Sequence, residues 1–128
     1  MMEARRQFGQ THSPKEIRLN KDDKLLEIDF EDGKTFNIPA ELLRVESPSA
    51  EVQGHSPEQK KLVGGRRHVN IMEISPVGNY AVALKFDDLH DSGIYTWDFL
   101  YNMGENQDAI WGDYLAAIEA AGISRDPA

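Results

Sequence analysis

The sequence of 128 residues contains no cysteine, and that absence excludes several kinds of site. Without a thiolate the chain forms no disulfide, no thiolate zinc site, no protein-ligated iron–sulfur cluster and no cysteine nucleophile. The lack of disulfides fits a reducing compartment. We therefore expect a fold that is held together by apolar burial alone.

The sequence also lacks a long apolar run and an excess of basic charge. No stretch reaches the roughly 18 apolar residues of a membrane span, and the N-terminal "MMEARRQFGQTHSP" has no apolar core of a secretory signal. Its 14 basic and 22 acidic residues give a formal charge of −8, whereas phosphate binding relies on clustered Lys and Arg. We expect a cytoplasmic protein that binds neither membrane nor nucleic acid.

Familiar catalytic motifs are absent as well. The sequence has no G-x-S-x-G, H-E-x-x-H or H-x-D pattern, and no glycine-rich phosphate loop that continues into Lys-Ser or Lys-Thr. Because no nucleophile–base pair is visible, we predict that the domain is not an enzyme, and a small-molecule enzyme is the weakest of three hypotheses.

The first third of the chain has the pattern of an antiparallel meander. Leu26, Ile28 and Phe30 alternate with charged residues, which is typical of a strand with one solvated face. Asp32-Gly33 is a strong hairpin signal, so we predict strands from Glu16 to Pro39. Residues 69–86 predict a second hairpin around "SPVGN", and residues 93–97 predict a strand that pairs back through the turn at His90.

Two helices complete the predicted α+β fold, in which a small, twisted, mainly antiparallel sheet is covered by both helices. Pro39 opens a short helix near Glu41 to Val45. Apolar residues at helical spacing from Ile110 predict a C-terminal helix over residues 108–121, with Gly122 as its C-cap. We predict a disordered tail at residues 1–14, one domain at 15–122 and a frayed tail at 123–128.

The aromatic run before the C-terminal helix leaves two alternatives open. In a strand, Tyr95, Trp97, Phe99 and Tyr101 would share one face. If the chain turns helical near Asp98, Trp97 and Tyr101 share a helical face and the other two diverge. In either case we expect core packing.

A long aperiodic loop, residues 47–68, separates the two strand regions. It is too long for a neutral connector in so small a domain. It carries the basic residues Lys60, Lys61, Arg66 and Arg67, next to Gly64-Gly65. Glycine N–H groups and guanidinium groups could bind an anion, but a flexible solvated loop is favoured.

The segment "FDDLHDSGIYTWDFL" places His90 among Asp87, Asp88 and Asp91. Imidazole and carboxylates can chelate a divalent ion. A closed zinc site, however, needs four ligands, usually Cys or His, and Asp is common in hairpin turns for other reasons. From the residues alone, the turn is favoured over the metal site.

Several segments together resemble the gamma-butyrobetaine hydroxylase-like N-terminal domain family, from about Lys15 to Gly104. The resemblance is most specific in "PVGNYAV", "GHSP" and "HDSGIYTWDFL", and the chain is similar to the stand-alone bacterial members, whose function is unknown. In the oxygenases that name the family, this domain precedes a catalytic domain that binds Fe(II) and 2-oxoglutarate. Because a second domain would need many more residues, we expect that this chain does not carry out the hydroxylation by itself.

The resemblance also implies where the family's zinc site would lie. The family holds zinc through Cys-x-Cys-x-x-Cys after a Leu-Arg pair, and through one histidine. Leu43-Arg44 matches that pair, so Ser47, Ser49 and Val52 fall on the cysteine positions and His90 on the histidine. Because hydroxyls are poor neutral zinc ligands and valine cannot ligate, the resemblance implies a lost zinc site.

Two further expectations follow from the resemblance. Similar sequences tend to have Gly at the position of Leu89, so Leu89 implies a different turn type or a strained or exposed residue. The family's domain is also fused to ATPases that carry iron–sulfur clusters, which implies an accessory role near cluster assembly or transfer.

The leading hypothesis is a non-catalytic binding or adaptor module that binds a protein, with no cofactor expected. The resemblance implies iron–sulfur proteins or 2-oxoglutarate oxygenases as the proteins to which it is accessory. Its surface would be the loop of residues 47–68 and the turn at His90, with contacts from Arg44, His55, Lys60, Arg66 and Arg67. The alternative is a metal-binding protein, in which His90 and Asp87, Asp91 or His55 hold a divalent ion weakly.

Overall fold

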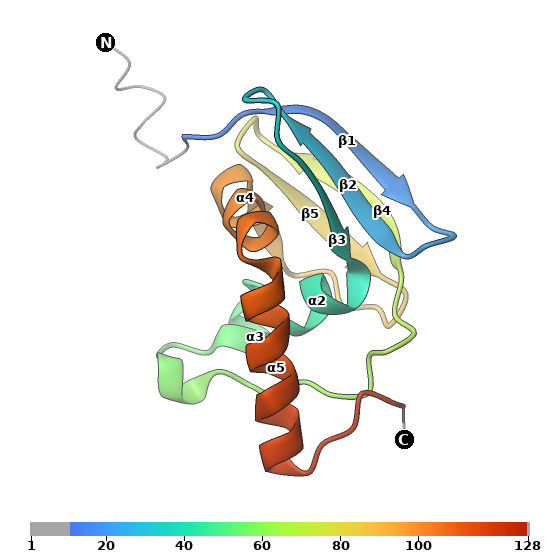
Figure 1. Ribbon diagram of the computed structural model, residues 1–128, viewed down its shortest axis with the longest axis vertical. Coiled ribbons are helices and arrows are strands. Elements are labelled where there is room, and N and C mark those ends of the chain that lie inside the picture. The colour runs from blue at the N-terminus through green and yellow to red at the C-terminus, as the bar shows by residue number, and fades with distance from the viewer. Residues whose placement is uncertain (1–10, 128) are drawn as a thin grey trace.

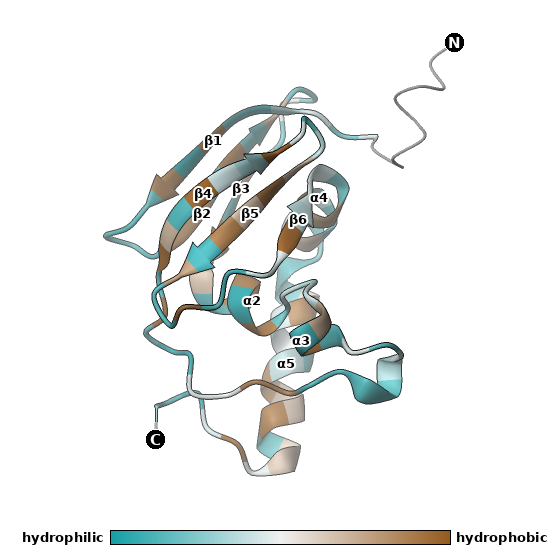
Figure 2. Cartoon of the chain, turned by 180° about the vertical axis from the view of Figure 1, so that it is seen from behind, coloured by the Kyte–Doolittle hydropathy of each residue, from teal (hydrophilic) through white to brown (hydrophobic). Residues whose placement is uncertain are grey.

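Two three-stranded antiparallel sheets form the upper part of the computed structural model, which describes residues 11–127. The first sheet has the order β1 (Pro14–Asn20), β2 (Leu25–Phe30), β3 (Thr35–Pro39). The second has the order β4 (Ile71–Val77), β5 (Ala81–Phe86), β6 (Ile94–Thr96). The first sheet lies in front of the second in Figure 1, and behind it in the reversed view of Figure 2.

The core lies between the two sheets because each inner strand alternates apolar and polar residues. Leu26, Ile28 and Phe30 of β2 are buried and belong to one cluster with the buried residues of β5. On the opposite face of the first sheet, Arg18 of β1 makes ion pairs of 3.1 and 3.0 Å with Glu27 and Asp29 of β2. The period of two therefore separates a dry face from a charged face, as the sequence predicts.

Helices lie beside and below the two sheets in the view of Figure 1. They are α2 (Ala40–Val45), α3 (Ala50–Gln53), the 3-10 helix η1 (Pro57–Gln59), α4 (Trp97–Glu105) and α5 (Gln107–Ala121). The short helix and the C-terminal helix agree with the predicted ones, and Gly122 caps α5 with a φ of 69°. The helix α5 extends beyond the sheets and lies beside α2 (Figure 1).

The α+β class is confirmed, and the structure divides the expected single sheet into two. The aromatic alternative is also resolved, because the chain becomes helical at Trp97, where the Thr96 side chain accepts a hydrogen bond from the Phe99 N–H. Tyr95 belongs to β6, is fully buried and donates to the Leu43 carbonyl at 2.6 Å. Thr96 is therefore both the last residue of β6 and the N-cap of α4.

The ends of the described chain are in contact with the rest of the domain. The Thr11 and His12 N–H groups donate to the Asp98 carboxylate, and the His12 ring stacks on Tyr101 at 3.5 Å. Residues 123–127, expected to fray, pair with the long loop, since the Gly65 N–H donates to the Ser124 carbonyl at 2.9 Å. The predicted N-terminal tail otherwise lies outside the described residues.

Within residues 11–127, no helix combines the length and the apolar character that crossing a membrane requires.

Candidate functional site

A buried cluster joins the turn at His90 to the start of the long loop. The His90 Nε2 lies 3.0 Å from the Ser47 Oγ and 3.4 Å from the Ser49 Oγ. Ser47 Oγ also donates to Ser49 Oγ at 3.2 Å and accepts from the Ser49 N–H at 3.3 Å. The Ser47–Ser49–His90 cluster therefore brings together three of the four positions that the resemblance assigned to the family's zinc site.

Local structure explains why these side chains meet. Ser47 and Ser49 lie between α2 and α3, and Val52 of α3, at the fourth position, is buried next to them in the chain. His90 follows a turn in which the Phe86 N–H donates to the His90 carbonyl at 2.9 Å. Only 4% of the His90 side chain is exposed, so the cluster is closed to solvent.

Burial also sets the charge of the cluster. It lowers the pKa of His90, because a low-dielectric site disfavours the imidazolium, and the Arg44 charge lowers it further. The pKa of Tyr95, beside the cluster, is raised for the same reason, burial of a group that would become charged. The neutral imidazole is therefore favoured, and hydrogen bonds join it to the two serines.

A second, charged cluster lies on the other side of the same turn. Asp88 Oδ1 accepts from the His90 N–H at 3.1 Å, and Asp88 Oδ2 lies 2.7 Å from both Arg44 Nε and Arg66 Nε. Burial opposes ionisation of Asp88, but the His90 N–H and the Arg44 guanidinium outweigh it and lower the pKa of Asp88. The Arg44–Asp88–Arg66 cluster thus contains two of the predicted anion-binding residues.

The turn between the two clusters contains a strained residue. Leu89 has a φ of 72° and is 75% exposed, so the residue is both strained and exposed, as the resemblance implied. A left-handed conformation is unfavourable for a side chain with a Cβ. The ring of His90 nevertheless points into the Ser47–Ser49–His90 cluster.

The remaining predicted binding residues are dispersed. Lys60 pairs with Glu46 at 2.7 Å, and Arg67 pairs with Asp126. His55 is exposed, and its N–H donates to the Gln59 side chain at 2.8 Å. The structure therefore unites Arg44 with Arg66 but not with His55, Lys60 or Arg67, and their binding roles stay predictions.

The metal alternative finds no support in the geometry. Among residues 11–127, no group of three or more His, Cys, Asp or Glu side chains is arranged to hold a metal ion. The Asp87 carboxylate accepts from the Asn70 N–H, and Asp88 is engaged by the arginines. The acidic group nearest to the His90 Nδ1 is Glu51, at 3.9 Å, which accepts from the Ser92 hydroxyl.

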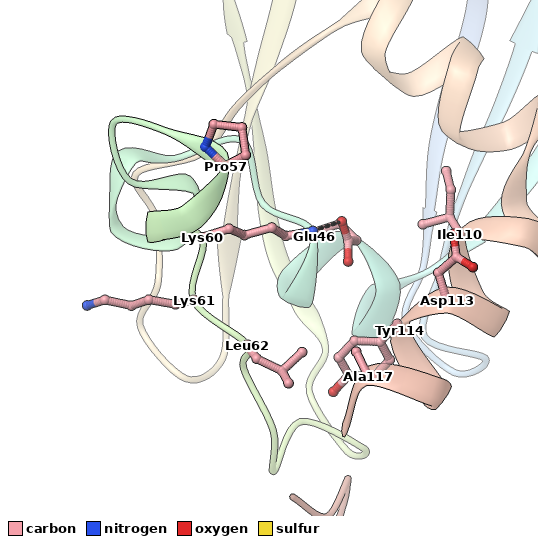
Figure 3. Close-up of a pocket in the computed structure, with 9 residues that line it drawn as sticks. All are labelled: Glu46, Pro57, Lys60, Lys61, Leu62, Ile110, Asp113, Tyr114 and Ala117. Carbon is pink, nitrogen blue, oxygen red and sulfur yellow. Dashed lines mark hydrogen bonds and ion pairs between the residues drawn. The ribbon is translucent and has the colours of Figure 1, made fainter. Parts of the chain in front are cut away.

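A groove of about 490 Å³ lies between the long loop and α5 (Figure 3). Its lining residues are Glu46, Pro57, Lys60, Lys61, Leu62, Ile110, Asp113, Tyr114 and Ala117. A second hollow of about 370 Å³ continues toward α4 and shares Glu46 and Ile110 with the first. The groove is therefore walled on one side by the segment that the Ser47–Ser49–His90 cluster anchors.

Sequence reasoning missed the groove and the role of Asp88. Tyr114 of α5 is buried in the core, and its hydroxyl also donates to the Val63 carbonyl in the loop at 2.7 Å. Sequence reasoning treated Asp88 as one of three similar turn residues. The sequence did contain an indication of this role. Asp88 precedes His90 by two residues, and an Asp at that spacing in a turn often accepts from the N–H two residues later.

The fold and the site define a small α+β domain in which a buried Ser–Ser–His cluster ties a long loop to a hairpin turn. The family model described as gamma-butyrobetaine hydroxylase-like, N-terminal, matches residues 17–101. The chain belongs to this family, which confirms the resemblance. No curated protein matches the sequence.

Solved structures of similar chains support the assignment. Two NMR solution structures are 45% and 47% identical, each with a TM-score of 0.80 over 93% of this chain and over 94% and 89% of theirs. A crystal structure of a protein of unknown function of the DUF971 family from Acidithiobacillus ferrooxidans ATCC 23270 is 39% identical. It has a TM-score of 0.62 and covers 72% of this chain and 92% of its own.

Proposed function

We propose that the domain is a non-catalytic binding module that recognises a protein partner through the loop of residues 47–68 and the turn at His90. One observation carries the proposal: the groove of about 490 Å³ is walled by a loop that is held in a defined position. Loops in fixed positions on a rigid scaffold are favourable binding elements, because less ordering is required when the partner binds.

The loop is held at several points along its length. Near its start, the Gln53 side chain donates to the Ser47 carbonyl at 2.8 Å. In its middle, the Lys61 N–H donates to the Val52 carbonyl at 2.6 Å. Near its end, Arg66 meets Asp88. These contacts oppose the flexible-loop alternative and support a preformed surface.

The groove has an apolar floor and a charged rim, which suits a peptide segment of another protein. Leu62 and Tyr114 provide apolar surface, and the Lys60–Glu46 ion pair crosses from the loop to the residue that caps α2 (Figure 3). Lys61 and Asp113 add one charge of each sign. Apolar anchors that are surrounded by polar groups are the usual composition of protein interfaces.

The Ser47–His90 pair supports a non-catalytic role, although it has the residue types of a nucleophile and its base. Ser47 has no exposed surface, and a Cβ at Gly93 would lie only 2.6 Å from its Oγ, so the space beside the hydroxyl is filled. A nucleophile must reach its substrate, and this hydroxyl has no route to one.

Binding to the two partner classes implied by the family tests the proposal. The purified domain is offered to an ATPase that carries an iron–sulfur cluster and to the catalytic domain of a 2-oxoglutarate oxygenase, and association is followed by biolayer interferometry. We expect saturable binding to one of them, weakened about tenfold or more by Leu62→Asp, because a charge in the groove is costly to desolvate.

The matched control is Met72→Asp on β4. Met72 and Leu62 are exposed to similar extents, 43% and 37%, but Met72 does not line the groove. We expect binding by Met72→Asp to equal that of the unchanged domain. Absence of saturable binding to both classes, or equal weakening by the two substitutions, would contradict the proposal.

A further inference from the structure

Two buried donor groups without acceptors lie in the same place. Within residues 11–127, the buried side-chain polar atoms that lack a hydrogen-bond partner are Arg44 Nη1 and Arg66 Nε. Arg66 Nε is within 2.7 Å of Asp88 Oδ2, but the two groups are not aligned for a hydrogen bond. Buried N–H groups of charged side chains are normally paired, because leaving one unpaired is costly.

The two guanidinium groups also outnumber the carboxylates between them. Both meet one oxygen of Asp88, and the other oxygen accepts from the His90 N–H. The Arg44 side chain is 10% exposed, so solvent does not replace the missing acceptor. The Arg44–Asp88–Arg66 cluster therefore has more donors than its resident carboxylate can satisfy.

Arg125, whose side chain is 27% exposed, shows what a complete pair looks like in the same domain. Arg125 donates from Nε to Glu41 Oε2 at 2.9 Å and from Nη2 to Glu41 Oε1 at 2.7 Å. This two-point contact matches the fork of a guanidinium to both oxygens of a carboxylate. Arg44 makes one aligned contact with Asp88 where Arg125 makes two with Glu41.

We infer that Arg44 and Arg66 form an oxyanion-binding site. In the free domain the Asp88 carboxylate occupies this site, and in the complex an anionic group of the binding partner takes its place. The inference rests on the proposed binding role and names the chemistry of one contact. Arg66 and Asp88, with side chains 32% and 22% exposed, lie on the solvent side, where a ligand can enter as Asp88 moves aside.

Phosphate is the oxyanion class that the donors fit best. Two guanidinium groups present several N–H donors in different directions, and a phosphate offers more acceptor oxygens than a carboxylate. A carboxylate group can accept from the same donors but has fewer acceptor oxygens. The experiment therefore compares a phosphate probe with a carboxylate probe.

Titration of the ¹⁵N-labelled domain with inorganic phosphate tests the site directly. The Nε–Hε signals of Arg44, Arg66 and Arg125 are followed by NMR, with sodium chloride at equal ionic strength as the reference and acetate as the carboxylate probe. We expect saturable shifts of Arg44 and Arg66 with phosphate, and none of Arg125, whose fork is filled. Stronger binding of acetate than phosphate would assign the site to carboxylates.

Three variants sharpen the test. Asp88→Asn removes the resident charge but keeps an oxygen for the His90 N–H, and should bind phosphate about tenfold tighter. Arg66→Lys, which cannot supply a fork, should bind about tenfold more weakly. Arg67→Lys is the matched control, because Arg67 is in the same loop and pairs with Asp126 instead; it should bind phosphate unchanged.

The inference is overturned if neither probe shifts Arg44 or Arg66 in a saturable manner, in both the unchanged domain and Asp88→Asn. It is also overturned if Asp88→Asn binds phosphate no tighter. A domain that fails these tests but still binds its protein partner in a Leu62-dependent way would leave the proposed function intact.

Discussion

The turn that contains Leu89 separates a buried polar cluster from a partly exposed one, and the two clusters differ in how fully their hydrogen bonds are formed. The Ser47–Ser49–His90 cluster is neutral, and each of its side chains has a partner. The Arg44–Asp88–Arg66 cluster is charged and leaves two donors without acceptors. Complete networks fix a structure, whereas incomplete ones are costly unless a ligand completes them.

This difference indicates that the two clusters, which lie on opposite sides of one turn, have different roles. The neutral cluster occupies the positions that the resemblance assigned to a zinc site, and it joins the loop and the turn by hydrogen bonds. The charged cluster has spare donors near the surface. We therefore expect changes in the neutral cluster to alter stability, and changes in the charged cluster to alter binding.

The largest expected effect on stability comes from breaking the neutral cluster with His90→Ala. The substitution leaves the hydroxyls of Ser47 and Ser49 without the imidazole and opens a cavity. We expect the free energy of unfolding to fall by about 2–4 kcal/mol, measured by chemical denaturation. The control, His55→Ala, removes an exposed ring and should change it by less than about 0.5 kcal/mol. Equal losses in the two variants would show that the cluster does not hold the loop.

A smaller effect is expected at the turn itself. Leu89→Gly should raise the free energy of unfolding by about 1 kcal/mol, because glycine adopts a positive φ without the penalty that a Cβ brings. The exposed side chain loses little packing. Thermal denaturation measures the change, and Leu89→Ala is the control, because it shortens the side chain and keeps the strain. A gain in Leu89→Ala as large as that in Leu89→Gly would argue against strain as the cause.

The smallest effect is the pH dependence of the neutral cluster. The folded-state pKa of His90 is lowered by burial and by Arg44, so the unfolded chain takes up a proton first as pH falls. The contribution of His90 is therefore complete above about pH 6.5, the unfolded value, and is lost progressively as pH falls toward the folded pKa.

Two measurements test whether the His90 contribution to stability decreases as pH falls. In an NMR titration, the His90 ring should titrate at lower pH than an unperturbed histidine, near 6.5. In denaturation experiments between pH 7.5 and 5, the unchanged domain should lose more stability than His90→Ala. A His90 ring that titrates above 6.5 would show instead that Glu51 dominates its environment.

Local patterns explain why much of the fold is predictable from the sequence. The alternation of Leu26, Ile28 and Phe30 follows the period of a strand, and Asp32-Gly33 meets the backbone requirement of a tight turn, with Gly33 at a φ of 92°. The helix α3 was missed because it has four residues, too few for periodicity to show. The division into two sheets was missed because strand patterns do not say which strands pair.

The site was predictable where family positions could be carried over residue by residue. Ser47, Ser49 and His90 meet as the resemblance implied, although 43 and 41 residues separate the serines from the histidine. The ion pairs were not predictable, because a basic residue in a loop can reach many carboxylates. Among the basic residues named from the sequence, Arg44 and Arg66 share Asp88, but Lys60 and Arg67 pair elsewhere.

The sequence by itself determined the strands, the hairpins and the two predicted helices, because each depends on residues within a few positions of one another. It also determined that no thiolate could hold the loop. Only the tertiary structure decided which acid each arginine meets, where the groove opens and which donors remain unpaired. Those features depend on contacts between residues far apart in the chain, such as Arg44 and Asp88, whose separation of 44 positions no local pattern spans.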